Sequence, residues 1–297
     1  MLKENTQVWL NGNLIDYKDA KIGILTHSLH YGSSVFEGIR AYKTDNGPAI
    51  FRLKEHIERL FYSAECLFMK IPFSKEELIE ATKKVINTNN LKSAYVRPIV
   101  YYGDESMGLN PSSNKVHVAI IAWEWGKYLH DTVRVKFSSI KRISEQTTKV
   151  DAKIGGHYIN SILATLEAKK LGFDEALLLD HEGNIAEGPG ENIFFIKDKT
   201  LYTPQLGKIL KGITRDSIIQ IAKDLDYEVI ERRISPYEIS AFDSAFFLGT
   251  AAEVTPISEI SGTKFNVKKV NEIKNKFFEI VAGKDKAYDF WLSYTKE

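Results

Sequence analysis

The chain has 297 residues, of which 43% are hydrophobic and 27% charged, and its formal net charge is +1. These values are typical of a globular protein with a sizeable core, and the small net charge excludes a strongly basic nucleic-acid-binding protein. We predict no membrane span, because no apolar run approaches the length needed to cross a bilayer. Cys66 is the single cysteine and the N-terminus MLKENTQ has no apolar signal segment, so we predict a cytoplasmic protein without disulfides.

The first half of the chain predicts strands and two helices. VWLNGNLID has two apolar runs around Asn11-Gly12, a pair that tolerates positive φ, and it predicts a hairpin. Residues 49–53 predict a strand, and residues 53–68 predict a helix because apolar residues recur at helical spacing. Ser74 and Glu77 form a capping-box pattern before a second helix. The β-branched runs SAYVRPIVYY and VHVAIIAWEW predict two further strands.

The second half alternates strands and helices. VRVKFSS, EALLLD, ENIFFIKD and TLYTP predict strands, and DSAFFLGTAAEVTP predicts a buried strand that ends in a Gly-Thr turn. YINSILATLEAKKLG predicts a helix that ends at Gly172, and ITRDSIIQIAKDLD predicts one that opens at Thr214. We therefore predict a mixed α/β (α+β) fold with antiparallel or mixed sheets. The expected divisions are a small N-terminal domain (1–125), an interdomain loop (126–132) and a larger C-terminal domain (133–297).

One motif offers a reactive amine. KVDAKIGGHY places Lys153 two residues before a glycine pair. A lysine whose pKa is lowered by burial or by a neighbouring cation offers a neutral amine that condenses with an aldehyde. Taken alone, the motif is a weak signal, and a solvated lysine before a helix N-terminus explains it better.

Three other motifs offer partners for a charged ligand. IAEGPGEN sets Glu187 beside a Gly-Pro-Gly bend, where its carboxylate can pair with a pyridine nitrogen or lie on a surface hairpin. The start of the helix at Thr214 suits a phosphate, although an ordinary threonine N-cap explains it too. The turn at Thr250 offers donors to an anion, or it is a plain turn. Together the motifs supply the groups that pyridoxal 5′-phosphate requires, and we predict no metal ligand.

Eight ordered stretches resemble the branched-chain-amino-acid aminotransferases, a class IV family of pyridoxal-phosphate enzymes. They cover nearly the whole chain and read LHYGSSVFEGIRAY, FRLKEHIERL, SAYVRPIVYYG, AWEWGKYL, DAKIGGHYINSILA, EGPGENIFF, GITRDSII and FLGTAAEVTPI. The resemblance implies fold type IV, with the two-domain architecture of D-amino-acid aminotransferase. It also implies a reversible ping-pong transfer of the amino group between leucine, isoleucine or valine and 2-oxoglutarate, with glutamate as the other product.

The resemblance further implies which residues bind the cofactor. Lys153 is expected to form the Schiff base and to move the substrate proton, and Glu187 to pair with the pyridine nitrogen. The other cofactor contacts are expected from Arg59, Tyr158, Ile213, Thr214 and Thr250. Without the resemblance, Arg59 would be interpreted as a surface arginine paired with Glu55.

The same resemblance implies a substrate site. Tyr95 and the amides of Thr250 and Ala251 are expected to hold the α-carboxylate. Arg97 and Tyr128 are expected to receive the distal carboxylate of glutamate. The apolar wall is expected from Phe36, Trp125 and Tyr158. Tyr31 and Leu109 are expected from a neighbouring subunit, which implies at least a homodimer and leaves a hexamer open.

Two alternatives remain open at this point. The same fold type includes D-amino-acid aminotransferases, R-selective amine transaminases and 4-amino-4-deoxychorismate lyase, and Tyr95-Val96-Arg97 favours the branched-chain version. A non-catalytic small-molecule-binding protein on this scaffold is the other, and the presence of Lys153, Glu187 and Arg59 argues against it. The sequence does not rank leucine, isoleucine and valine.

Overall fold

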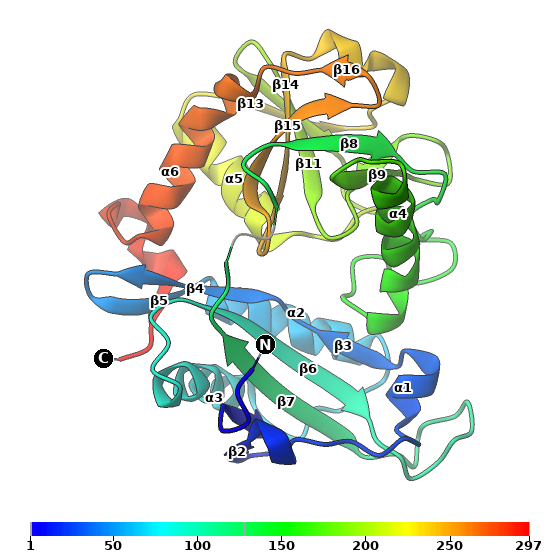
Figure 1. Cartoon of the computed structure of the whole chain (residues 1–297), viewed down its shortest axis with the longest axis vertical. Helices are drawn as coiled ribbons and strands as arrows, with labels where there is room; N and C mark the ends of the chain where they lie inside the picture. Colours follow the sequence, from blue (N-terminus) through cyan, green and yellow to red (C-terminus); the bar gives the residue numbers. More distant parts are fainter. Residues whose placement is uncertain (1, 127–128, 297) are drawn as a thin grey trace. The chain divides into compact units, whose positions relative to one another are not determined.

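The computed structural model of the chain describes residues 2–126 and 129–296 (Figure 1). It divides into two compact units: Met1–Gly126, Ala152–Gly156 and Ile280–Glu297 form the first, and Lys127–Asp151 with His157–Glu279 form the second. In these described ranges, no helix is both long and apolar enough to cross a bilayer.

The first unit is built on an antiparallel sheet. Its strands follow the order β17-β5-β4-β6-β7-β1-β2, and β3 pairs with β6. Asn11 and Gly12 have φ values of 48° and 95°, as the predicted hairpin requires. The strand bounds are β1 Gln7–Leu10, β2 Asn13–Asp16, β3 Ser34–Phe36, β4 Ile39–Thr44, β5 Gly47–Phe51, β6 Ala94–Tyr102, β7 Val116–Trp123 and β17 Leu292–Tyr294.

Two helices cover one face of this sheet. The apolar faces of α2 (Leu53–Glu65) and α3 (Lys75–Thr88) pack on alternate strand residues, among them Val96 and Val100 of β6. The predicted capping box at Ser74 is present. The helix predicted for residues 53–68 ends at Glu65, and Phe68 has a φ of 57°. On β6, the residues between the core positions, including Tyr95 and Arg97, face the opposite side of the sheet from α2 and α3, because side chains alternate along a strand. A short helix, α1 (His27–Tyr31), precedes β3.

The second unit is built on a mixed sheet. Its order is β10-β9-β8-β15-β14-β11-β12-β13, with β16 paired to β15. The pairs β8–β9, β8–β15 and β12–β13 are parallel, and the others are antiparallel, in agreement with the prediction of antiparallel or mixed sheets. The strand bounds are β8 Val133–Phe137, β9 Glu175–Leu179, β10 Ile185–Glu187, β11 Asn192–Lys197, β12 Thr200–Pro204, β13 Glu228–Arg232, β14 Ser244–Gly249, β15 Glu253–Ile260 and β16 Thr263–Lys264.

The central strands of this sheet are buried on both faces. Residues 193–196 of β11 and 246–248 of β14 are apolar and at most 1% exposed, which explains their unbroken hydrophobic runs. The helix α4 (Tyr158–Lys170) packs beside β9, as Figure 1 shows, and α5 (Ile213–Asp224) contacts β13 and β14. The remaining helix is α6 (Asn271–Val281), and the short 3-10 segments are Tyr17–Asp19, Gly155–His157, Pro236–Ala241, Val267–Val270 and Lys286–Trp291.

The division into units differs from the domains expected from the sequence in two segments. Residues 280–297 belong to the first unit, because β17 pairs with β5 along Leu292–Phe51 and Tyr294–Ala49. Residues 152–156 also belong to the first unit, because Val35 and Ile154 form an antiparallel bridge. Both differences arise from long-range strand pairing, to which local sequence patterns are insensitive.

Candidate active site

The residues predicted for the site fall into two groups, each within one unit. The first unit contains Tyr31, Phe36, Arg59, Tyr95, Arg97, Leu109, Trp125 and Lys153. The second contains Tyr158, Glu187, Ile213, Thr214, Thr250 and Ala251. Tyr128, also predicted, lies outside the described residues.

Main-chain contacts fix the position of Lys153. Its backbone N–H donates to Ser63 Oγ at 2.9 Å, and its carbonyl accepts from the Phe36 N–H at 3.1 Å. The bridge between Val35 and Ile154 continues this pairing by one residue. The ammonium nitrogen of Lys153 lies 5.0 Å from the centre of the Phe36 ring. Lys153 is thus half-buried and anchored between β3 and α2, unlike an ordinary solvated lysine.

A buried carboxylate that the sequence analysis missed lies beside these residues. Glu37 follows Phe36 and is 0% exposed. Its carboxylate accepts from Arg59 through Nε at 2.6 Å and Nη2 at 2.9 Å, and from His56 Nδ1 at 2.7 Å. The interpretation of Arg59 as a surface partner of Glu55 is therefore wrong, because the Arg59 side chain is only 12% exposed and its guanidinium bonds Glu37.

Charge and burial together determine the protonation of this cluster. Burial by itself raises the pKa of Glu37, but the charge of Arg59 and the hydrogen bonds from His56 and Arg59 outweigh it and hold that pKa well below its usual range. For His56, burial lowers the pKa, and the charges of Arg59 and Lys153 lower it further. The Glu37 carboxylate raises the pKa of His56 but does not offset these effects. Near neutral pH the cluster therefore contains a carboxylate, a guanidinium and a neutral imidazole that donates through Nδ1.

The face of the first sheet opposite α2 and α3 carries an aromatic and arginine cluster. Arg97 Nη2 donates to the Tyr95 hydroxyl at 3.0 Å, and its guanidinium carbon lies 4.5 Å from the centre of the Phe36 ring. Tyr95 stacks on Trp125 with a centroid distance of 4.8 Å. A Cβ atom on Gly38 would lie 2.2 Å from the Tyr95 hydroxyl oxygen, so glycine makes room for that hydroxyl.

Arg97 has unused capacity to bind an anion. Its Nε atom is buried and has no hydrogen-bond partner among the described residues. A buried guanidinium N–H without an acceptor is costly. A ligand carboxylate would satisfy this donor, which fits the role expected for Arg97.

Glu187, in the second unit, is held by three donors. It ends β10 and is 6% exposed, so it does not lie on a surface hairpin. Its carboxylate accepts from Arg142 Nε, from Asn192 Nδ2 at 3.0 Å and from the Leu210 N–H at 3.1 Å. Arg142 also donates to the Val150 carbonyl at 3.1 Å. Because a carboxylate has about four acceptor sites, Glu187 keeps capacity for one more donor, such as the N–H of a protonated pyridine.

The N-terminus of α5 adjoins this carboxylate. The N-cap is Gly212, so Thr214 is the second helical residue and the threonine N-cap interpretation is wrong. A Cβ atom on Gly212 would lie 2.0 Å from Asn192 Oδ1, which shows how closely the helix start packs against the amide that holds Glu187. The backbone N–H groups of Ile213 and Thr214 are at the end of the helix that favours phosphate.

The turn between β14 and β15 lies against the glycine bend that follows Glu187. Asn192 pairs with Leu248 in the sheet, and Thr250 and Ala251 come directly after β14. A Cβ atom on Gly249 would lie 3.2 Å from the Gly190 carbonyl oxygen. Within the second unit the structure therefore groups the acid, the start of α5 and the Thr250 turn. Tyr158 is the first residue of α4 and is half-buried.

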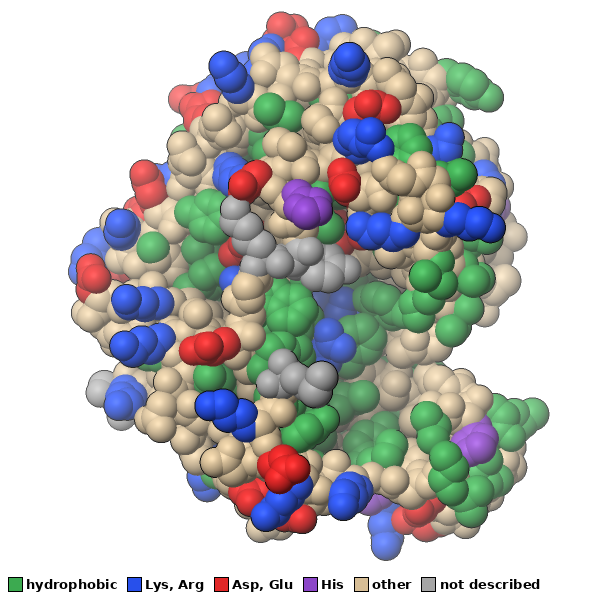
Figure 2. All heavy atoms as spheres, in the orientation of Figure 1, with side chains coloured by type: hydrophobic (Ala, Val, Ile, Leu, Met, Phe, Trp, Pro, Cys, Tyr) green, Lys and Arg blue, Asp and Glu red, His purple; other side chains and the backbone are tan. Residues whose placement is uncertain are grey.

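Tyr31 and Leu109 stand apart from the cluster around Lys153. They are 48% and 80% exposed, and the Tyr31 hydroxyl donates to the Met107 carbonyl at 3.2 Å. In the described part of the chain, neither side chain has a hydrogen bond or ring contact with the Lys153 cluster. Figure 2 shows hydrophobic side chains gathered at the α1 end of the first unit; the exposed ones include Ile24, Leu25 and Leu29.

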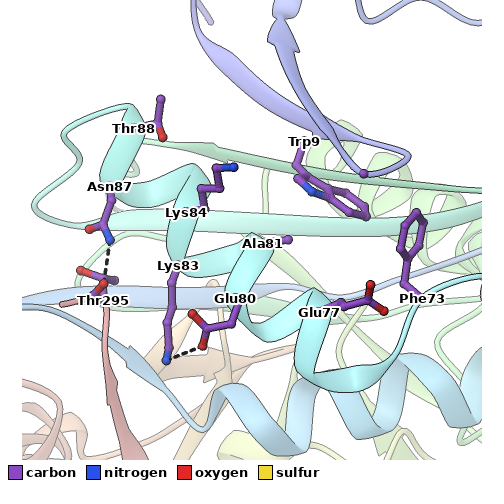
Figure 3. Close-up of a pocket in the computed structure, with 11 residues that line it drawn as sticks. Trp9, Phe73, Glu77, Glu80, Ala81, Lys83, Lys84, Asn87, Thr88 and Thr295 are labelled. Atoms are coloured by element: carbon purple, nitrogen blue, oxygen red, sulfur yellow. Dashed lines mark hydrogen bonds and ion pairs between the residues drawn. The ribbon is translucent and has the colours of Figure 1, made fainter. Parts of the chain in front are cut away.

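The first unit also contains a pocket of about 530 Å³ that includes none of the predicted residues. It runs along α3 beside Trp9 and Phe73 (Figure 3). Its acidic side chains are already engaged: Glu80 pairs with Lys83 at 2.8 Å, and Glu77 accepts from the Ser74 N–H at 2.6 Å. Among the described side chains, no group of three His, Cys, Asp or Glu residues is placed to hold a metal ion.

Sequence reasoning missed the residues that support the predicted ones. His56 and Ser63 lie three residues before and four residues after the predicted Arg59 on α2, so the three form a polar stripe on one helix face from which the two missed residues could have been recognised. Arg142 lies in an irregular segment without a periodic pattern, and no sequence signal identifies it.

Comparisons with known proteins agree with this geometry. Residues 34–260 match the model of the amino-transferase class IV family. The chain is 47% identical to a branched-chain-amino-acid aminotransferase of Pseudomonas aeruginosa over 97% of both chains. It is similar to the crystal structure of the T.th. branched-chain amino acid aminotransferase complexed with N-(5′-phosphopyridoxyl)-L-glutamate, with a TM-score of 0.95, 45% identity and 99% of both chains covered.

A third similarity is to the branched-chain aminotransferase of Thermoproteus uzoniensis crystallised with norvaline. The TM-score is 0.95 at 41% identity, covering 98% of this chain and 99% of the other. The family match covers more than half of the chain, and the similarities to named enzymes extend over nearly all of it. The chain therefore belongs to the class IV aminotransferase family, in which it groups with the branched-chain-amino-acid aminotransferases.

Proposed function

We propose that this chain is a branched-chain-amino-acid aminotransferase that uses pyridoxal 5′-phosphate. It transfers the amino group between leucine, isoleucine or valine and 2-oxoglutarate. The observation that carries the proposal is the 47% identity to an enzyme of that name over 97% of both chains. Each unit carries groups that the cofactor requires, which supports the proposal: the first has a lysine amine, and the second has a buried carboxylate with spare acceptor capacity and helix N-terminal amides.

When bound, the cofactor supplies an aldehyde and an electron-withdrawing ring that acidifies the substrate Cα–H. Lys153 would provide the amine that links to the cofactor and, once released by the substrate, would move the proton between the substrate Cα and the cofactor C4′. Its fixed backbone keeps the amine within reach in both roles. Glu187 accepts from the ring nitrogen and keeps that nitrogen protonated, while Arg142 and Asn192 hold the carboxylate in place.

We assign the remaining predicted residues to cofactor anchoring and substrate binding. Arg59 and the amides of Ile213 and Thr214 bind the phosphate, with the Thr250 hydroxyl, and Tyr158 bonds the cofactor's phenolic oxygen. Tyr95 and the amides of Thr250 and Ala251 bind the α-carboxylate.

Substrate side chains meet an apolar wall with a polar rim. Phe36, Trp125 and Tyr158 accept the aliphatic side chain, and the Arg97 N–H groups donate to the distal carboxylate of glutamate, with Tyr128. An apolar pocket discriminates by only about 1–3 kcal/mol per methylene, so all three branched-chain amino acids are expected as substrates.

We also propose that the enzyme acts as a homodimer at least. The exposed Tyr31 and Leu109 then serve the site of the neighbouring subunit. An apolar pocket of about 330 Å³ is lined by Leu29, Ile99 and other residues of the first unit, and it supports the proposal that a neighbouring subunit covers this surface. The single cysteine fits a reducing compartment, and we propose that the enzyme acts in the cytoplasm.

A kinetic panel with a lysine variant tests the proposal. The purified enzyme should transaminate L-leucine with 2-oxoglutarate, and Lys153→Ala should lose this activity while keeping its melting temperature within a few degrees. Lys149, four residues away and exposed, provides the control, and Lys149→Ala should retain normal turnover. Borohydride reduction of the holoenzyme should attach the cofactor to the peptide that contains Lys153, as mass spectrometry would show.

Two results would overturn the assignment. Turnover of D-alanine or 1-phenylethylamine without turnover of L-leucine would favour the D-amino-acid or amine transaminases. Protein that stays colourless with added pyridoxal 5′-phosphate would favour a non-catalytic binding protein.

A further inference from the structure

The phosphate-binding role proposed for Arg59 raises the question of what orients its guanidinium. Glu37 engages two of the five N–H groups of Arg59, at Nε and Nη2, in the side-on geometry that fixes a guanidinium plane. Glu37 itself is 0% exposed, and His56, which bonds it, is 1% exposed. These contacts fix both the position of the guanidinium and the direction of its other edge.

The three side chains belong to two rigid elements. Glu37 directly follows β3, and its backbone N–H donates to the Pro98 carbonyl of β6 at 2.9 Å. His56 and Arg59 lie on α2, one helical turn apart, and both reach the same carboxylate. The same helix holds the Lys153 backbone through Ser63. The same helix, α2, thus carries Arg59 and holds the backbone of Lys153.

We propose that Glu37, supported by His56, is the positioning residue that presents Arg59 to the cofactor phosphate. This inference rests on the proposed function. Long arginine side chains lose rotamer freedom when they bind a ligand, and holding the side chain in advance reduces that cost. His56 donates from Nδ1 to the oxygen that also accepts from Arg59 Nη2, so it fixes the carboxylate that fixes the arginine.

Comparing two ligands tests this role. The purified enzyme is freed of cofactor by dialysis and titrated with pyridoxal 5′-phosphate or with pyridoxal, which lacks the phosphate. In Glu37→Gln the amide has the size of the carboxylate. Its NH₂ group, however, cannot accept the hydrogen bonds that Arg59 and His56 donate to a carboxylate oxygen. Affinity for pyridoxal 5′-phosphate should fall about 10–100-fold, by analogy with the loss of metal affinity when the hydrogen-bond partners of metal ligands are removed. Affinity for pyridoxal should change by less than about 3-fold, since no phosphate contact is lost.

Matched variants separate positioning from general damage. Glu58→Gln makes the same chemical change at an exposed position of α2, adjacent to Arg59, and should leave both affinities unchanged. His56→Phe should weaken pyridoxal 5′-phosphate selectively, and His56→Asn, whose amide N–H can replace Nδ1–H, should restore most of the loss.

A double variant guards against a simple loss of folding. Arg59→Ala leaves Glu37 buried without its cation and should lower the melting temperature, and adding Glu37→Gln should recover part of that loss. In the Arg59→Ala background, Glu37→Gln should have no further effect on pyridoxal 5′-phosphate affinity. A further loss there, or equal losses for both ligands in Glu37→Gln, would overturn the inference. Wild-type enzyme that binds neither ligand would instead refute the proposed function.

Discussion

Replacing Arg142 by methionine tests how the buried acid Glu187 is stabilised. The two side chains are 10% and 7% exposed and form a direct ion pair. Removing one partner of a buried pair costs about 3–5 kcal/mol, because the remaining charge has lost its counterion. Glu187 keeps the donors from Asn192 and Leu210, so we expect a loss at the lower end of this range, about 3 kcal/mol.

This loss converts into a measurable change in melting temperature. An unfolding entropy of about 2.1 cal/mol/K per residue gives about 0.6 kcal/mol/K for 297 residues. A loss of about 3–5 kcal/mol therefore lowers the melting temperature by about 5–8 °C when the chain unfolds in one step. Calorimetry and urea unfolding of Arg142→Met would measure it.

A surface pair provides the control. Lys269 bonds Asp243 at 2.6 Å in the same unit, but the two side chains are 40% and 37% exposed. Lys269→Met should therefore cost less than about 1 kcal/mol. Adding Glu187→Gln to Arg142→Met should recover part of the loss, because the unpaired charge is then absent. If Arg142→Met costs no more than Lys269→Met, and the double variant is no more stable than the single one, the ion-pair argument is wrong.

Three further predictions use the same structure. Gly38→Ala should raise KM for amino acids about 10-fold or more with little change in melting temperature, because the new Cβ would meet the Tyr95 hydroxyl oxygen at 2.2 Å; an unchanged KM would contradict this. Phe247→Ala should cost about 3–5 kcal/mol in urea unfolding, since Phe247 is 0% exposed, and a cost below about 1 kcal/mol would show that its packing is loose. Stability should fall as pH drops below the ordinary pKa of 6.5 for histidine, because the lowered pKa of His56 lets the unfolded chain take up the proton first. The lowered pKa of Glu37 adds a second decline below its ordinary value of 4.5. Melting curves from about pH 2 to 8 would check both. A His56→Asn variant with the same decline below pH 6.5 as the wild type would refute the first.

Local patterns predicted the regular elements well. The hairpin at Asn11-Gly12 and the capping box at Ser74 are present as predicted, because φ preferences and caps depend on neighbouring residues. Element ends were less accurate: α2 stops at Glu65, and the N-cap of α5 is Gly212 instead of Thr214. At helix ends, tertiary packing competes with weak local preference.

For the site, motifs in the sequence predicted the residues that we propose bear the chemistry. It did not identify the residues that hold them. Without the family resemblance, the helix pattern pairs Arg59 with its neighbour Glu55, whereas the structure pairs it with Glu37, 22 residues away. Arg142 and Glu187 are separated by 45 residues, and Ser63 and Lys153 by 90.

The sequence by itself determined the family, the order of most strands and helices, and the positions of the amine, the acid and the turns for which we propose phosphate binding. Only the tertiary structure decided which side chains compensate the buried charges and to which unit residues 152–156 and 280–297 belong. Periodicity, turns and caps act over a few residues and leave a local pattern. The partner of a buried charge is chosen by chain segments that meet only after folding, and nothing nearby in the sequence records that choice.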